Sequence, residues 1–203
     1  PMAIRSILHY PDPRLRRRAE PVAAVTAEVR RLVDDMAEPM YDAPGVGLAA
    51  IQISVPLRVI VMDVAEAGGE PLREALINPE IIEASPEMER AEEGCLSIPD
   101  VQVEVGRHQK ITVRYQGVGG AFLQMTAEGF VARVLQHELD HINGRLMTAA
   151  KELGEPLAAN PDIASDDLMA YIVAQQGDMD AALAAYRVSH PAPPAAPAPP
   201  TVG

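Results

Sequence analysis

Residues 127–144, AEGFVARVLQHELDHING, contain the helix that decides the fold class of this chain. Apolar residues recur in this stretch at helical spacing, and Gly144 is a natural end because many helices stop at a glycine. The apolar positions are Phe130, Val131, Val134, Leu135, Leu139 and Ile142. The pattern predicts an amphipathic helix over about 127–143 that buries one face.

The predicted helix carries His137-Glu138-Leu139-Asp140-His141, the pattern HExxH. Two residues four positions apart on a helix differ by about 40° in direction and roughly 6 Å in height, so both imidazoles can reach one ion. Glu138 beside them can contact a water molecule bound to that ion. The alternative is a solvated helix face with two accidental histidines. Only five histidines occur in the chain, so two beside one glutamate favour a metal site.

A catalytic site of this kind needs a third protein ligand and one open coordination position. The candidates downstream of the helix are Glu152, Glu155 and His190. Upstream, the single cysteine, Cys95, lies in the segment EGCLS at residues 93–97, between predicted strands. A thiolate is a strong ligand for divalent first-row metals, so the most economical ligand set is Cys95, His137 and His141. A buried structural cysteine and a nucleophile are the alternatives for Cys95.

The chain before residue 127 predicts one helix and several short strands. The helix covers 26–38, with Thr26 as a candidate N-cap, and Pro39 is expected to stop or kink it. The strands are predicted at 57–64, 101–105, 111–115 and, after a turn at 117–120, 121–126. The second and third of these strands are expected to be neighbours in one antiparallel sheet.

These strands lie too close together in the sequence for helical crossovers between parallel strands. The predicted fold is therefore α+β, with the central HExxH helix packed against antiparallel β-sheets, an N-terminal helix and a C-terminal helix. The C-terminal helix is predicted at about 166–187, where acidic residues in the first turn favour the helix dipole. Residues 191–203, PAPPAAPAPPTVG, are predicted to be disordered because they cannot bury a core.

Composition excludes several classes of function. The chain has 203 residues, a formal net charge of −12 and no long Lys/Arg-rich block. Direct specific nucleic-acid binding is not expected, because that affinity comes mainly from neutralising phosphates. No apolar stretch approaches the roughly 18 residues of a membrane span, and the N-terminus lacks a signal peptide's apolar segment. We therefore expect a cytoplasmic protein that does not bind membranes.

Three segments resemble the signature motifs of peptide deformylases, in the same order along the chain. They are GVGLAAIQ at residues 45–52, EGCLS at residues 93–97 and QHELDH at residues 136–141. The resemblance implies a hydrolase that removes the N-terminal formyl group from formyl-methionyl nascent polypeptides at the ribosome and releases formate. It also implies one divalent metal per chain, typically Fe(II), with Zn(II), Ni(II) or Co(II) able to substitute. A catalytic domain is expected at 1–150, a helical extension at 151–190 and the tail at 191–203.

The resemblance further implies roles for individual residues. Water activated by the metal attacks the formyl carbon, with Glu138 as general base and then general acid. The oxyanion would accept hydrogen bonds from the Gln52 side chain and the Leu96 backbone N–H. The peptide is expected to bind as an added β-strand, with its methionine side chain in an apolar pocket. The expected substrate-binding residues are Val46, Gly47, Gly94, Phe130, Arg133 and Val134.

Two of these side chains have further expectations attached. Arg133 shares the ligand face of the helix and is expected to offer its aliphatic stem to the pocket rim. Glu93 is expected to be a structural charge that pairs with Arg107. Phe130 and Val134 have the alternative of belonging to the core.

Two other functions stay open at this point. A zincin-like endopeptidase would take its third ligand downstream of His141, and Cys95→Ser would then spare metal binding. A protein of the same fold could instead bind peptides without catalysis. Glu138 and Gln52 argue against that reading, because a binding protein has no need of a proton shuttle.

Overall fold

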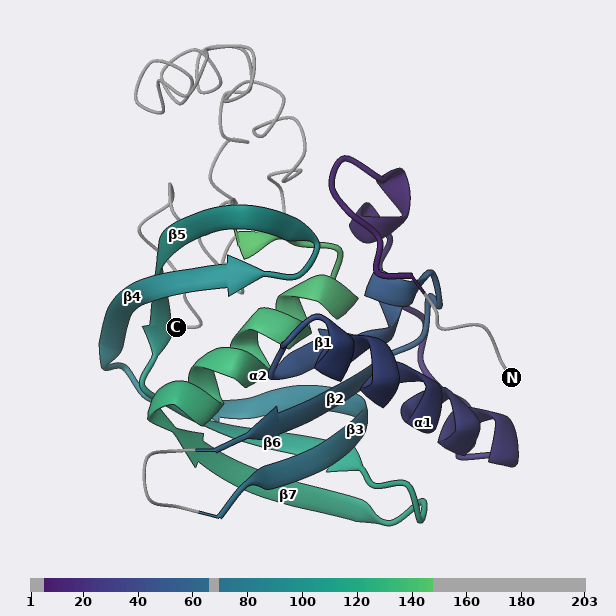
Figure 1. Ribbon diagram of the computed structural model, residues 1–203. Helices are drawn as coiled ribbons and strands as arrows, with labels where there is room; N and C mark the ends of the chain where they lie inside the picture. Colours follow the sequence, from purple (N-terminus) through teal and green to yellow (C-terminus); the bar gives the residue numbers. More distant parts are fainter. Residues whose placement is uncertain (1–5, 66–69, 148–203) are drawn as a thin grey trace, which may run out of the picture. The chain divides into compact units, whose positions relative to one another are not determined.

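The molecule is built from two sheets and two α-helices, as the computed structural model in Figure 1 shows. The structure describes residues 6–65 and 70–147, all within the first of two compact units of the chain, residues 1–165. The helices, with η for 3₁₀, are η1 (Pro13–Arg16), α1 (Ala27–Asp42), η2 (Ala50–Ile53) and α2 (Gly129–Ile142). The strands are β1 (Gly47–Ala49), β2 (Val59–Val64), β3 (Leu72–Ala84), β4 (Met88–Cys95), β5 (Ile98–His108), β6 (Lys110–Gln116) and β7 (Phe122–Glu128).

Five strands form one antiparallel sheet in the order β1-β2-β3-β6-β7, and β4 and β5 form a separate antiparallel hairpin. In Figure 1, α2 runs between this hairpin and the five-stranded sheet, and α1 lies beside β1 and β2. The two α2 histidines and the hairpin therefore lie on the same side of the helix, away from the large sheet.

Apolar packing fixes α2 on the large sheet. Leu135, Leu139 and Ile142 belong to a buried cluster with residues of β2 and β6 such as Ile60 and Val113. Burying one such side chain fully stabilises the fold by about 1.5–3 kcal/mol. A second cluster lies under α1, and a third joins the hairpin to the chain after α2 through Val103, Val105, Leu146 and Met147.

The α+β class, the antiparallel sheets and the N-terminal helix are confirmed, and α2, β2 and β7 lie where strands and a helix were predicted. Gly144 follows α2 with φ +75°, and a Cβ there would lie 2.3 Å from the Arg16 carbonyl oxygen. Only glycine fits this end of the helix without displacing the backbone. The helix predicted at 166–187 and the tail at 191–203 lie outside the described residues.

The predicted pairing of 101–105 with 111–115 is wrong. Those segments belong to β5 and β6, which lie in different sheets: β5 pairs with β4, whereas β6 pairs with β3 and β7. Only Gln109 separates β5 from β6, and its N–H donates to the Glu87 carbonyl while its carbonyl accepts from Gly129. The chain therefore changes sheets at this residue instead of folding back as a hairpin.

Pro39 does not stop α1, one of its two predicted effects, because the helix continues to Asp42. Pro39 lacks the N–H that would donate to the carbonyl four residues earlier, but its own carbonyl still accepts a hydrogen bond from the Ala43 N–H. Burial of Met40 in the cluster under α1 favours this last turn. Within 6–65 and 70–147, neither α-helix is long and apolar enough to cross a bilayer.

Candidate metal centre

Three potential metal ligands meet between the hairpin and α2. Cys95 is the last residue of β4 rather than part of a loop, and His137 and His141 project from α2 one turn apart. Sγ of Cys95 lies 3.3 Å from Nε2 of His141, which lies 3.2 Å from Nε2 of His137. All three donor atoms fall within 4.8 Å of one another. The structure thus brings together the ligand set that was predicted from the sequence.

This donor set fits a divalent first-row ion. Tetrahedral zinc-type geometry separates two imidazole nitrogens by about 3.3 Å, and a nitrogen from a sulfur by about 3.6 Å. The observed separations of 3.2 and 3.3 Å are close to these values. Sulfur and imidazole ligands suit Zn(II), Fe(II), Ni(II) and Co(II). The residues present therefore fit one metal ion.

The electrostatics of the two histidines also favour a cation. Burial opposes charge on His137, but hydrogen bonds with Cys95 and Glu93 outweigh it and hold the pKa of His137 well above its usual value. Burial and the neighbouring His137 hold the pKa of His141 well below its usual value. His141 is thus kept neutral, as a ligand must be, whereas His137 has to release a proton when it binds a metal.

Glu93 orients His137 from behind. Its Oε2 accepts a hydrogen bond of 3.0 Å from Nδ1 of His137, which leaves Nε2 for the metal. Burial raises the pKa of Glu93, but hydrogen bonds from Arg107 and His137 outweigh it and hold the pKa well below its usual range. The predicted ion pair with Arg107 is confirmed, at 2.9 Å through both carboxylate oxygens.

Glu138 stands beside the ligands with a carboxylate that is only partly used. The residue is 4% exposed, and its Oε2 is buried without a hydrogen-bond partner among the residues that the structure describes. Burial raises the pKa of Glu138 to about 7. A carboxyl group with a pKa near neutrality can both accept and release a proton at physiological pH.

Gln52 and Leu96, the two predicted oxyanion donors, line the same cavity. Oε1 of Gln52 accepts from the Ala49 N–H at 2.8 Å, and Nε2 donates to Oγ of Ser97 at 3.1 Å. The orientation of the amide is therefore fixed, with its second N–H still available. Leu96 directly follows Cys95 and lines the cavity described next.

A cavity of about 830 Å³ opens in front of the three ligands. Its wall includes two of them, Cys95 and His137, together with Glu138, while His141 lies behind and is fully buried. Every other residue predicted for the site also lines it: Val46, Gly47, Gln52, Gly94, Leu96, Phe130, Arg133 and Val134. Val134 is buried in the wall, whereas Phe130 is half exposed at the rim.

Two unpaired strand edges border this cavity. Within the described ranges, β1 pairs only with β2, and β4 pairs only with β5. The Asp63 N–H donates to the Val46 carbonyl, so the antiparallel alternation turns the N–H and C=O of Gly47 away from β2. These two groups therefore face the free edge of the sheet. On the opposite wall, Glu92, Glu93 and Gly94 line the cavity from β4.

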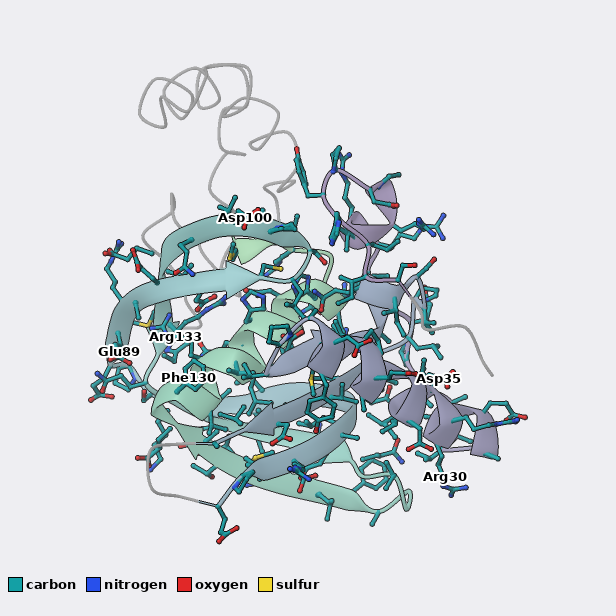
Figure 2. All side chains as sticks on the ribbon, viewed as in Figure 1. Arg30, Asp35, Glu89, Asp100, Phe130 and Arg133 are labelled. Atoms are coloured by element: carbon teal, nitrogen blue, oxygen red, sulfur yellow. The ribbon has the colours of Figure 1, made fainter. Side chains whose placement is uncertain are left out.

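Arg133 has hydrogen bonds that were not predicted, beside the predicted place of its stem at the cavity. It lines the cavity, but its guanidinium turns into the hairpin and donates to Glu93 and to two backbone carbonyls, those of Val105 and Glu89. Figure 2 shows Arg133 on α2 near Glu89 of β4, with Phe130 at the same end of the helix. Only the stem of the side chain is left to face the cavity.

Several residues of this site were missed as functional candidates. Ser97 holds Gln52, and Asp140 accepts a hydrogen bond of 2.6 Å from Arg107. Both stand inside the quoted motifs, EGCLS and HELDH, so their place in the motif was the available signal. The hairpin also supplies cavity residues that no pattern marked, namely Ile98, Pro99, Asp100, Val101 and Gln102.

A single metal centre with a buried carboxylate beside it and an open cavity in front defines a metal-dependent hydrolase. The sequence profile described as polypeptide deformylase matches residues 4–154. The chain belongs to this family, the hydrolases that remove the formyl group from the N-terminus of newly made polypeptides.

Relatives and solved structures agree with this assignment. A peptide deformylase of Afipia carboxidovorans is 52% identical over 145 residues, covering 71% of this chain and 85% of that protein. The crystal structure of peptide deformylase from Thermotoga maritima has 44% identity and a TM-score of 0.68, covering 73% of this chain and 97% of that one. A Met-Ala-Ser-bound class I type b peptide deformylase from Acinetobacter baumannii has 33% identity and a TM-score of 0.69, covering 73% and 98%.

Proposed function

We propose that this chain deformylates formyl-methionyl peptides at the cavity in front of Cys95, His137 and His141. The observation that carries the proposal is the meeting of these three donor atoms within 4.8 Å, beside an unpartnered oxygen of Glu138. A sulfur and two imidazoles leave one coordination position for water or substrate. The cavity gives a peptide access to that position.

The three ligands would hold one divalent ion, Fe(II) in the native protein. Zn(II), Ni(II) and Co(II) suit the same sulfur and nitrogen donors and would substitute to differing extents. Such an ion lowers the pKa of a bound water molecule toward neutrality and polarises the formyl oxygen. Glu93 would keep His137 in the tautomer that presents Nε2.

Glu138 would move the proton. Its buried Oε2, which has no hydrogen-bond partner among the described residues, would accept the proton of the attacking water, and a pKa of about 7 supports its giving that proton to the departing amine. Negative charge that develops on the formyl oxygen would be stabilised by the Gln52 side-chain amide and the Leu96 backbone N–H. Ser97 and Ala49 hold Gln52 in place, so this donor need not reorganise during the reaction.

The peptide would bind as a strand between the two open edges, pairing with Gly47 on β1 and with Gly94 on β4. The tripeptide Met-Ala-Ser bound to the Acinetobacter baumannii relative supports a peptide ligand in this fold. The methionine side chain would enter the apolar part of the cavity, against Val46, Phe130, Val134 and the stem of Arg133. Gly47 would offer the peptide the N–H and C=O that face the free edge of β1.

The partners and location follow from the same assignment. The substrates would be nascent chains at the ribosome, in the cytoplasm, with no direct specific binding to nucleic acid and none to membranes. The catalytic domain would be residues 1–150, which the family match to 4–154 supports. Residues 151–190 would form a helical extension, and 191–203 a disordered tail.

A zincin-like endopeptidase is the competing function. Its third-ligand candidates, Glu152, Glu155 and His190, lie outside the described residues. The 3.3 Å approach of Cys95 Sγ to His141 Nε2 favours the cysteine instead. Cys95→Ser separates the two functions, because it weakens metal binding only if the sulfur is a ligand.

The decisive assay is formate release from a formyl-Met peptide, measured anaerobically with defined metals for the parent and for Glu138→Ala. The variant is expected to keep its metal and to lose about 10²–10⁴ in kcat, the usual scale of general acid–base catalysis. A metal-loaded parent that releases no formate would overturn the proposal, and so would Glu138→Ala at the parent's rate. The first result would leave a peptide-binding protein without catalysis, whereas the second would leave an enzyme that does not use Glu138 to move the proton.

A further inference from the structure

The hairpin that carries Cys95 has no strand neighbour to hold it in place. In the part of the chain that the structure describes, β4 and β5 pair only with each other. Cys95 ends β4, while both histidines stand on α2, which packs on the five-stranded sheet. The spacing of the three donors therefore depends on what fixes the hairpin on α2.

The face of α2 toward the hairpin is polar. Arg133, Gln136, His137 and Asp140 follow one another at i, i+3, i+4 and i+7, which places them on one side of the helix. Three of them are buried, and the side chain of His137 is only 11% exposed. Each of the four makes a hydrogen bond to the hairpin. Polar contacts thus replace the apolar packing that α2 uses on its other side.

Arg133 makes the broadest of these contacts. Nη1 donates to Oε1 of Glu93 at 2.8 Å and to the Val105 carbonyl at 2.9 Å, and Nη2 donates to the Glu89 carbonyl at 2.8 Å. One side chain of α2 therefore binds the backbone of both β4 and β5, and also the carboxylate that orients His137. The fixed fork of a guanidinium suits this geometry, which a single ammonium cannot reproduce.

Arg107 connects the two elements in the opposite direction, from the hairpin to α2. It projects from β5 to Asp140 of α2 at 2.6 Å and also binds Glu93 through two nitrogens, both at 2.9 Å. These contacts join side chains only. With Arg107 in place, Glu93 would still have a charged partner if Arg133 were lost. Of the two arginines, only Arg133 binds the strand backbones, and of the α2 side chains it binds both β4 and β5, whereas Gln136 binds only the backbone of His108 at the end of β5.

We propose that Arg133 is a positioning residue of the metal centre. Its guanidinium holds β4 and β5 on α2, and so keeps the sulfur of Cys95 at the distance from His137 and His141 that one ion requires. This role rests on the proposed ligand set and differs from the substrate contact of the aliphatic stem. The two roles lie on different atoms of one side chain, so they can be separated experimentally.

The test compares Arg133→Met, which keeps the stem, with Arg133→Lys, which keeps the charge. Arg90→Met is the matched control, because Arg90 lies on β4, is half exposed and forms its ion pair with Glu104 of β5, away from α2. Two properties are measured: amide hydrogen exchange of the metal-free proteins, and Co(II) affinity determined by titration calorimetry, which does not depend on the cysteine being present. Cys95→Ser is included as the reference for a lost ligand.

Arg133→Met is expected to raise exchange about tenfold or more in 88–95 and 98–108 while β2, β3 and β6 keep the parent's protection. Its Co(II) dissociation constant should rise about 10–100-fold, the usual effect of removing an outer-shell partner of a metal site. Arg133→Lys should recover part of both effects, and Arg90→Met should match the parent.

The proposal is overturned if Arg133→Met has the same hydrogen exchange in the hairpin and the same Co(II) affinity as Arg90→Met. A rise in KM alone would overturn it as well, because only the substrate contact would then be affected. If Arg133→Met does not fold, Arg133→Lys is the deciding variant. Hydrogen exchange and Co(II) affinity equal to the parent's in Arg133→Lys would then refute the positioning role. Parental Co(II) affinity in Cys95→Ser would instead refute the ligand set, while hairpin exchange would still report on Arg133.

Discussion

Gly47 of β1 leaves no room for a side chain beside the carboxylate of Glu138: a Cβ built on this glycine would lie 2.7 Å from Oε1. It would also lie 3.0 Å from Cγ1 of Val134. A side chain at this position of the strand would therefore displace Glu138, the proposed proton-transfer group. The glycine is required by this close approach and not by an unusual backbone angle.

Gly47→Ala is therefore expected to displace the carboxylate. A displacement of about 1 Å near reacting groups can cost about 10²-fold in rate, so we expect kcat to fall by at least about tenfold while the metal is retained. Formate release and metal analysis of the purified variant measure the two quantities. Gly106→Ala is the control, since the nearest atom to its Cβ would be 3.8 Å away. Equal kcat values for the two variants would contradict the contact.

Gln52→Ala tests the side-chain donor to the oxyanion. Losing one such donor typically lowers kcat by about 10²–10³, and metal content should not change because Gln52 is not a ligand. Steady-state kinetics with a formyl-Met peptide give the effect. Gln124→Ala, on an exposed position of β7, is the control and should behave as the parent. If Gln52→Ala raises KM and leaves kcat unchanged, Gln52 is assigned to substrate binding instead.

Phe130→Ala tests the rim of the cavity. Phe130 is 50% exposed there, and its loss should raise KM several-fold with little change in kcat, the signature of contacts made equally in the bound and transition states. Phe122→Ala removes the same side chain from β7, where it is 77% exposed and lies outside the cavity lining. Rates should be unaffected there. A matching rise in KM for Phe122→Ala would point to a general effect of surface hydrophobicity.

Removing the metal should lower thermal stability. A ligand present at about 100 times its Kd stabilises the folded state by about 2.7 kcal/mol, roughly 5–11 °C in Tm for a domain of this size. Calorimetry of the parent with and without a chelator measures the shift. The shift should be smaller for Cys95→Ser, because two ligands remain. If the Tm of the parent does not change when the chelator is added, no metal links α2 to the hairpin.

The elements that the sequence predicted well are those whose signal is local. The apolar period and the ligand spacing of α2 both lie within one short segment, and so does the apolar run of β2. The strand β4 gave no such signal because residues such as Glu89, Arg90 and Glu92 interrupt any apolar alternation. Glu93, on the inward face of this strand, is held by hydrogen bonds from Arg107 and Arg133 and not by apolar packing.

The long strand β3 was missed for a different reason. Asn78 has φ +52° and is followed by Pro79, and the pairing with β6 shifts register between Ile77 and Glu80. In the sequence, an Asn-Pro pair of this kind indicates a turn and not the middle of a strand. The contacts of Glu93 were partly predictable, since Arg107 is near in the chain. Those to Arg133 and His137 span 40 and 44 residues, beyond the reach of any local pattern.

The bare edges of β1 and β4 bear on how many different proteins this chain can serve. Every translated message continues differently after its initiator residue, yet each presents the same repeating amides to a strand edge. Under the proposed binding mode, recognition through those amides would give nearly equal affinity to almost any continuation. Breadth across a whole proteome would then follow from the backbone of the enzyme, and discrimination would be concentrated on the first residue.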